Sequence, residues 1–215
     1  NAPAIVAQSS GGGGGMIVGV TSHNGAVFGS NAMIGDGGKV NVTVDRQMNL
    51  GTSGGGSYGI IAQSIGGGGI LSGNTADTSA LGDTFAAQNT NLSGNGSDVH
   101  IVVGSGSTVQ TEGKLAHAIV AQSIGGGGGF IATPDEGVVM GTAGGKGNSG
   151  SVTVDNAGTV RANGAGSSAI VLNSDGQQGN TGSMTMNNDA GGTIWGDNAL
   201  AAPAVQFLRN GLRSL

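Results

Sequence analysis

Hydrophobic and polar residues alternate in short runs along this chain, and glycine-rich stretches separate the runs. The clearest alternating runs are residues 40–44 (VNVTV), 99–103 (VHIVV) and 151–154 (SVTV). A β-branched residue at every second position is typical of a strand with one buried face, because successive side chains point to opposite sides. No window carries the hydrophobic stripe of an amphipathic helix. The pattern therefore predicts an all-β chain.

A second pattern is a hydrophobic block that recurs along the sequence. Residues 4–10 (AIVAQSS) are followed by five glycines, and similar blocks stand at 59–65 and 118–124. The first isoleucine or valine of each block lies at position 5, 60, 119, 170 or 205, which gives steps of 55, 59, 51 and 35 residues. Such a period indicates a repeat architecture. Residues 1–215 are predicted to form one array, with units that start near 4, 59, 118, 169 and 204, the last of them partial.

The alternating run precedes the block at a constant distance in three units. Val44, Val103 and Val154 each lie 16 residues before the isoleucines Ile60, Ile119 and Ile170. On this alignment Asp45 matches Asp155 at the strand ends, and Thr43 matches Thr153 within the strands. A third short strand is predicted between run and block, at 108–111, 159–162 and 193–195.

Three short strands per unit cannot each bury a hydrophobic face alone, so successive units must stack on one another. Stacking at the spacing of paired strands, about 4.8 Å, places like residues on like. The sequence therefore predicts a right-handed parallel β-helix, or β-solenoid, with long glycine-rich insertions. It also predicts a structural ladder of side-chain amides that hydrogen-bond along the stack. Its members are Gln8, Gln63, Gln122 and Asn173.

The insertions between each block and the next alternating run are themselves patterned. Each opens with hydrophobic residues, at 16–18, 70–71 and 130–131. In the block before the first insertion, both Ile5 and Val6 are large and hydrophobic, although hydrophobic and polar residues should alternate in a strand with one solvent-exposed face. A sheet covered on both faces explains this pattern. We therefore expect the insertions to fold back over one outer face of the stack.

Composition narrows the class of protein. Of the 215 residues 48 are glycine, while aromatic residues make up 3% and charged residues 9%. A chain without cysteine has neither a disulfide framework nor a thiolate metal site. With 7 Lys and Arg against 12 Asp and Glu, the chain is not suited to binding nucleic acid. The sequence begins without methionine or a signal peptide, which indicates a mature product or a piece of a larger protein.

Several motifs resemble known chemistry, but each is better interpreted as a turn. Gly-x-Ser-x-Gly occurs at 51–55 and 55–59, yet a nucleophile elbow requires a following helix and a strand follows here. The same objection applies to Gly-x-Gly-x-x-Gly at 54–59 as a dinucleotide site. Residues 93–99 partly match a calcium-binding nonapeptide, but they lack its first glycine and are interpreted as a solvated turn.

Acidic and histidine residues form no catalytic pattern. His23, His100 and His117 share no metal-ligand spacing. Asp135 and Glu136 have no matching acid in the other insertions, as a pair that cleaves polysaccharides would need. We therefore predict no catalytic residue, no cofactor-binding residue, no metal ligand and no cofactor.

The repeated block, (A/G)-I-(V/I)-A-Q-S-I followed by glycines, resembles a repeat of very large passenger regions in bacterial autotransporters and adhesins. Residues 158–164 (GTVRANG) are similar to the strand–turn pattern of the same family, and the resemblance is strongest over residues 1–175. It implies a β-helical stalk on the outer surface of a Gram-negative bacterium, or secreted from it. A C-terminal membrane barrel, which this sequence lacks, would carry the stalk there. The family offers no shared catalytic motif.

The expected function is therefore structural or adhesive, as a stalk that mediates surface attachment or forms extracellular matrix or filaments. Expected partners are host, abiotic or neighbouring-cell surfaces, with self-association end to end or side by side through uncharged terminal strands. The alternative is a polysaccharide-active β-helix enzyme, although no acid cluster is present. Binding to a crystal lattice such as ice is a third idea, and Val102 opposes it because it interrupts the threonine row.

Overall fold

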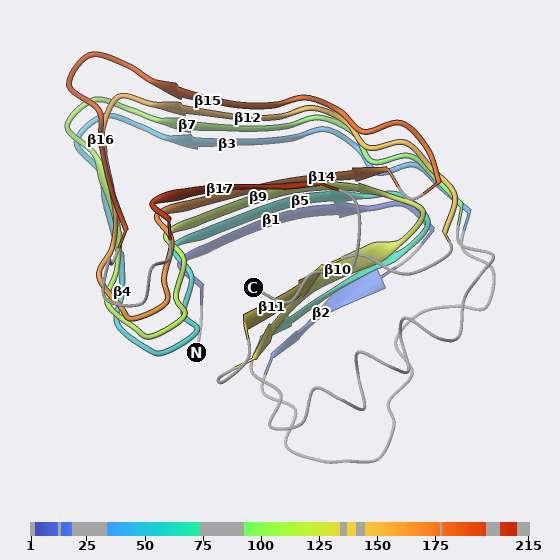
Figure 1. Cartoon of the computed structure of the whole chain (residues 1–215), viewed down its shortest axis with the longest axis horizontal. Helices are drawn as coiled ribbons and strands as arrows, with labels where there is room; N and C mark the ends of the chain where they lie inside the picture. The colour runs from blue at the N-terminus through green and yellow to red at the C-terminus, as the bar shows by residue number, and fades with distance from the viewer. Residues whose placement is uncertain are drawn as a thin grey trace.

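The fold of this chain is all-β. The computed structural model describes residues 3–12, 14–18, 34–73, 93–133, 137–140, 145–176, 178–196 and 203–209. Within these ranges every regular element is a strand, so the all-β prediction is confirmed (Figure 1). None of the residues in these ranges belongs to a helix of the length and hydrophobicity needed to cross a membrane.

The recurring hydrophobic blocks pair with one another in a five-stranded sheet, here called the block sheet. Its strands, in spatial order, are β1 (Ile5–Ser10), β5 (Ile60–Ile65), β9 (Ile119–Gly125), β14 (Ile170–Gly176) and β17 (Val205–Arg209). All neighbours are parallel, and the first residue of each strand pairs with the first residue of the next. The order in space therefore follows the order in sequence, with one strand added by each repeat.

Two further parallel sheets take one strand from each of four repeats. The first, the β3 sheet, contains β3 (Val40–Val44), β7 (Val99–Val103), β12 (Val152–Asn156) and β15 (Met184–Asn188). The second, the β4 sheet, contains β4 (Asn49–Thr52), β8 (Thr108–Thr111), β13 (Thr159–Ala162) and β16 (Thr193–Gly196). Figure 1 shows the chain passing through the β3 sheet, the β4 sheet and the block sheet in turn, so that equivalent strands stack. This arrangement is compatible with a β-solenoid.

The core lies between these three sheets. It is built from alternate positions of the strands in these three sheets, as the period of two requires. Ile60 and Ala62 of β5, Ile101 of β7 and Val109 of β8 are all 0% exposed. These residues belong to one cluster that runs through the whole stack. Valine, isoleucine and alanine fill most of this core, which is consistent with the aromatic content of only 3%.

The register of β12 differs from the sequence alignment by two positions. Val154 pairs with Ile101, and Asn156 pairs with Val103. The cause is a shorter turn, because only Ala157 and Gly158 connect β12 to β13, whereas residues 104–107 connect β7 to β8.

The predicted matches within this strand are therefore wrong. Asp155 pairs with Val102 and lies inside the strand, whereas Asp45 follows the end of β3. Thr153 pairs with His100, so it does not share a row with Thr43, which pairs with Val102. A shift of two residues keeps every side chain on its expected face, which is why the alternation alone could not reveal it.

A fourth sheet follows the glycine runs. It contains β2 (Gly14–Val18), β6 (Gly69–Gly73), β10 (Gly128–Thr133) and β11 (Gly137–Met140), of which β11 is antiparallel to β10. Figure 1 draws this sheet beside the block sheet. The block-sheet residues that point away from the core are buried nonetheless, with Ile61 2% exposed and Val120 and Val171 0% exposed. The outer face of the three middle strands of the block sheet is therefore covered, while 19–33, 74–92, 134–136 and 141–144 of the insertions lie outside the described residues.

Candidate functional site

The predicted amide residues lie in one row across the block sheet. Gln8 Nε2 donates to Gln63 Oε1 at 3.4 Å, Gln63 Nε2 to Gln122 Oε1 at 2.6 Å, and Gln122 Nε2 to Asn173 Oδ1 at 3.2 Å. Asn173 Nδ2 continues the row to the backbone oxygen of Leu208 at 3.3 Å. Gln63 and Gln122 are both 0% exposed. The two middle amides therefore form their hydrogen bonds where no solvent reaches them.

This row lies on the outer, covered face of the block sheet. Gln63 is two residues from Ile61, so both side chains are on the face opposite to the core residues Ile60 and Ala62. Each amide carbonyl in the middle of the row accepts one bond and each amide nitrogen donates one. The row therefore fixes neighbouring repeats in register rather than offering groups to a ligand.

The serine after each amide forms a second cross-link, on the core side of the sheet. Ser64 Oγ donates to the backbone oxygen of Gly38 at 2.9 Å and accepts from the backbone nitrogen of Ser97 at 2.9 Å. Ser123 Oγ repeats this pattern with Ser97 O and Gly150 N, at 2.9 and 2.8 Å. Each buried serine thus joins the end of a block strand to the turns of two successive repeats.

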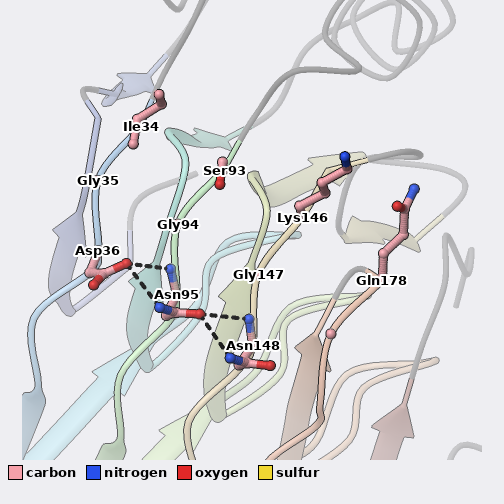
Figure 2. Close-up of a pocket in the computed structure, with 11 residues that line it drawn as sticks. Ile34, Gly35, Asp36, Ser93, Gly94, Asn95, Lys146, Gly147, Asn148 and Gln178 are labelled. Atoms are coloured by element: carbon pink, nitrogen blue, oxygen red, sulfur yellow. Dashed lines mark hydrogen bonds between the residues drawn. The ribbon is translucent and has the colours of Figure 1, made fainter.

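A third row lies in those turns and consists of Asp36, Asn95, Asn148 and Asn180. The backbone and side-chain nitrogens of Asn95 both donate to Asp36 Oδ1, at 2.7 and 3.2 Å. The same atoms of Asn148 donate to Asn95 Oδ1 at 2.9 and 3.1 Å, and Asn180 N donates to Asn148 Oδ1 at 2.8 Å. Figure 2 shows the dashed bonds that join the first three of these side chains. We call this set the Asx row.

A glycine precedes each member of the Asx row, and the reason is steric. A Cβ atom on Gly94 would lie 2.0 Å from the backbone oxygen of Gly35, and one on Gly147 would lie 1.9 Å from that of Gly94. No side chain fits at those distances, so the backbones of successive turns contact each other directly. The sequence signal was the recurrence of Gly-(Asp/Asn) at 35–36, 94–95, 147–148 and 179–180, with another glycine one or two residues later. The interpretation of residues 93–99 as a solvated turn considered one repeat alone and therefore did not detect this recurrence.

A groove of about 460 Å³ lies beside the Asx row, where the described chain resumes after the insertions. Ile34, Ser93, Lys146 and Gln178 line it, together with the glycine and Asx residues of the same turns (Figure 2). Asp36 is the single acidic residue among the described residues that line it, and its Oδ1 atom already accepts two hydrogen bonds. The groove therefore does not present the pair of carboxylates that hydrolysis of a glycosidic bond requires.

His100 and Asp155 form a polar pair on the outer face of the β3 sheet. His100 Nε2 lies 2.7 Å from Asp155 Oδ2, and Asn187 Nδ2 donates to Asp155 Oδ1 at 2.7 Å. The hydrogen bond from Asn187, followed by that from His100, lowers the pKa of Asp155 below its usual value. The side chains of His100 and Asp155 are 42% and 30% exposed, so this pair is a partly solvated link between β7, β12 and β15.

His117 is instead buried at the corner before β9. It is 2% exposed, and its Nδ1 atom accepts a hydrogen bond from Ser168 N at 2.9 Å. Burial lowers the pKa of His117 to about 4. Its ring lies 5.7 Å from that of Tyr58, the equivalent residue of the preceding repeat, and burial raises the pKa of Tyr58. His117 is therefore a neutral packing residue.

The remaining sequence candidates do not form a reaction centre in the described ranges. Ser57 is 4% exposed and lies in the turn that leads directly into β5, so no helix follows it. Among the residues with a described position, no three histidine or acidic side chains lie close enough to hold a metal ion. His23, Asp135 and Glu136 fall outside the described residues.

The outer face of the β4 sheet carries a mixed polar and aromatic group. Glu112 Oε1 accepts hydrogen bonds from the side chains of Gln110 and, at 2.8 Å, Asn163. The guanidinium carbon of Arg161 lies 5.6 Å from the centre of the Trp195 ring, which is a cation–π contact. Trp195 itself is 58% exposed at the end of the row.

Comparison with known proteins identifies no relative. The chain matches no protein-family model, no curated protein and no solved structure.

Proposed function

We propose that this chain is a right-handed parallel β-solenoid that serves as a structural, adhesive stalk without enzymatic activity. A parallel strand that returns to its own sheet does so almost always by a right-handed connection, which supports the handedness. The stalk is placed on the outer surface of a Gram-negative bacterium or released from it, as the resemblance of the repeated block implies. Its partners are host, abiotic or neighbouring-cell surfaces.

The observation that carries this proposal is the use of polar side chains as cross-links. The amide row joins the block sheet through four repeats, and the Asx row joins the adjoining turns. The amide row is buried in its middle and the Asx row is exposed, and in both the polar side chains bond to the neighbouring repeat, which supports a regular stack of repeats.

The surface of the residues that the structure describes is consistent with adhesive contact to another surface over an extended area. Charged residues make up 9% of the chain, and the outer faces of the β3 and β4 sheets carry mostly threonine, asparagine and glutamine, together with His100, Asp155, Arg161 and Trp195. Such faces bind through shape and many hydrogen bonds, each weak on its own. Adhesion through a long repeated surface gains strength from multiplicity.

The test is attachment of cells that display the chain. A laboratory strain without its own adhesins would present residues 1–215 on its surface, and attached cells would be counted on abiotic and cell-coated surfaces. We expect attachment above that of a strain displaying an unrelated domain of equal length. The matched control is Gly94→Val, which disrupts the stack and should abolish the gain. Attachment equal to that of the unrelated domain would overturn the adhesive function.

A further inference from the structure

Hydrophobic exposure concentrates at the two ends of the stack. The hydrophobic residues that pack against the core but remain partly exposed are Ile5, Ala7, Leu50, Met184, Met186, Ile194 and Val205. The first three belong to β1 and β4, and the others to β15, β16 and β17. These strands are the outermost ones of their sheets. Within the described residues, the core is therefore sealed along its length and open at both ends.

The two ends differ in the size of their side chains. One row of the core runs from Ala7 through two alanines and Leu172 to Phe207, which is 52% exposed. On the outer face of the β4 sheet, a row runs from Gly51 through Gln110 and Arg161 to Trp195, which is 58% exposed. In both rows the smallest residue is at the N-terminal end and the largest at the C-terminal end.

The N-terminal end also has space for a large side chain. A Cβ atom added at Gly51 would meet no atom within 4 Å, in contrast to the tight glycines of the turns. If the C-terminal end of another stack continued the same register, Trp195 would lie opposite Gly51 and Phe207 opposite Ala7. Each large residue would then meet a small one, as complementary packing requires.

The backbone edges match in the same way. In the block sheet β1 and β17 are the edge strands, and no strand in the described ranges pairs with their outer sides. The same holds for β3 and β15, and for β4 and β16. Since all pairs inside these sheets are parallel, an added copy in the same orientation would extend each sheet with the hydrogen-bond pattern it already has. The interface between two copies would thus repeat the interface between two repeats.

We propose that copies of this chain associate head to tail, with β17, β15 and β16 of one copy paired to β1, β3 and β4 of the next. The contact is heterologous, because two different surfaces meet, and it generates an open filament rather than a closed dimer. The inference rests on the proposed stalk function and specifies one of its partners, namely a second copy of the chain.

The experiment uses one variant for each end. Phe207→Lys places a charge at the C-terminal end, and Gly51→Trp fills the space at the N-terminal end. Sedimentation velocity over a wide concentration range should show that the unmodified chain grows into oligomers. Each variant alone should associate at least about tenfold more weakly, because loss of one well-packed aromatic contact is of that size. Thr108→Lys, which adds the same charge on the interior strand β8, should assemble like the unmodified chain.

Mixing the two end variants tests the polarity of the contact. Phe207→Lys keeps an intact N-terminal end, and Gly51→Trp keeps an intact C-terminal end. An equimolar mixture should therefore form dimers that stop at one contact, while circular dichroism shows that both variants are folded. An unmodified chain that stays monomeric, a mixture that stays monomeric, or variants that assemble as the unmodified chain does would each overturn the inference.

The result is separable from that of the adhesion test. A monomeric chain whose display still promotes cell attachment would overturn head-to-tail association and leave the stalk function standing. A chain that forms filaments but promotes no cell attachment would overturn the adhesive function and leave head-to-tail association standing.

Discussion

Replacement of Gln122 by leucine is the sharpest test of the amide row. Gln122 is 0% exposed and bonds both neighbours, as acceptor from Gln63 at 2.6 Å and as donor to Asn173 at 3.2 Å. Gln122→Leu therefore leaves a donor on Gln63 and an acceptor on Asn173 without partners in a region closed to water. Leucine fills a similar volume, so the lost hydrogen bonds dominate the effect.

The magnitude follows from those two groups. Each unpartnered buried polar group costs about 1–3 kcal/mol. The hydrophobic surface that leucine adds recovers about 1–2 kcal/mol. We therefore expect Gln122→Leu to lower the free energy of unfolding by about 3 kcal/mol. Gln8→Leu, at the half-buried end of the row with one bond of 3.4 Å, should cost less than about 1 kcal/mol.

Urea unfolding followed by circular dichroism measures both changes. An unchanged dependence of the unfolding free energy on urea concentration would show that the folded and unfolded states of each variant are comparable with those of the unmodified chain. The double variant Gln63→Leu/Gln122→Leu adds a second check. Removing both partners of one bond orphans fewer groups than the two single changes together, so its cost should be clearly smaller than their sum. Equal losses for Gln8→Leu and Gln122→Leu, or additive losses in the double variant, would refute the view that the row is buried and interdependent.

The other expected outcomes concern pH, turn packing and the surface pair. Because burial lowers the pKa of His117 from 6.5 to about 4, the unfolded chain binds a proton that the folded chain does not. Stability should therefore fall by about 3 kcal/mol as the pH drops from 6.5 to 4, and urea titrations of His117→Ser should lack this fall. Thermal melts of Gly94→Ala should show a loss of about 2–3 kcal/mol, whereas Gly51→Ala, which meets open space, should be neutral or stabilising by less than about 1 kcal/mol. Asp155→Asn changes a partly solvated partner of His100, so we expect the free energy of unfolding to fall by less than about 1 kcal/mol, and by less still in high salt. A larger loss that does not depend on salt would contradict a surface role for this pair.

Much of the stack could be predicted from the sequence because equivalent residues pair with equivalent residues. The blocks that begin at Ile5, Ile60 and Ile119 start with the residues that pair in the structure. The amide row follows from that register without further assumption, since strands in register bring identical side chains together. The alternation of valines likewise predicted which residues lie in the core, because the period of two fixes which side chains point inward and which point outward.

The remaining features depend on local geometry that hydrophobic alternation does not encode. Asn156 occupies a buried strand position where β3 and β7 have valine, and its amide donates to Oδ1 of Asn188, the paired residue of β15, at 2.8 Å. An alignment anchored on valines therefore skipped it and misplaced Asp155. The Asx row escaped notice for a different reason, since its members are 59, 53 and 32 residues apart and combine aspartate with asparagine. A search for glycine followed by either residue, at the same distance before each alternating run, would have found it.

The direct contact between successive turns has a consequence for how such a chain changes length. Every cross-link in the amide and Asx rows joins one repeat to its immediate neighbour. Excising the 59 residues from Ile60 to Ala118 would bring Gln8 opposite Gln122 and Asp36 opposite Asn148, with chemistry already used elsewhere in the stack. Loss or duplication of a whole unit is therefore a small step for this architecture, whereas inserting a single residue into a strand would turn its hydrophobic face outward. Recombination between units, rather than point substitution, is the route by which a lineage could lengthen or shorten this protein without redesigning its interior.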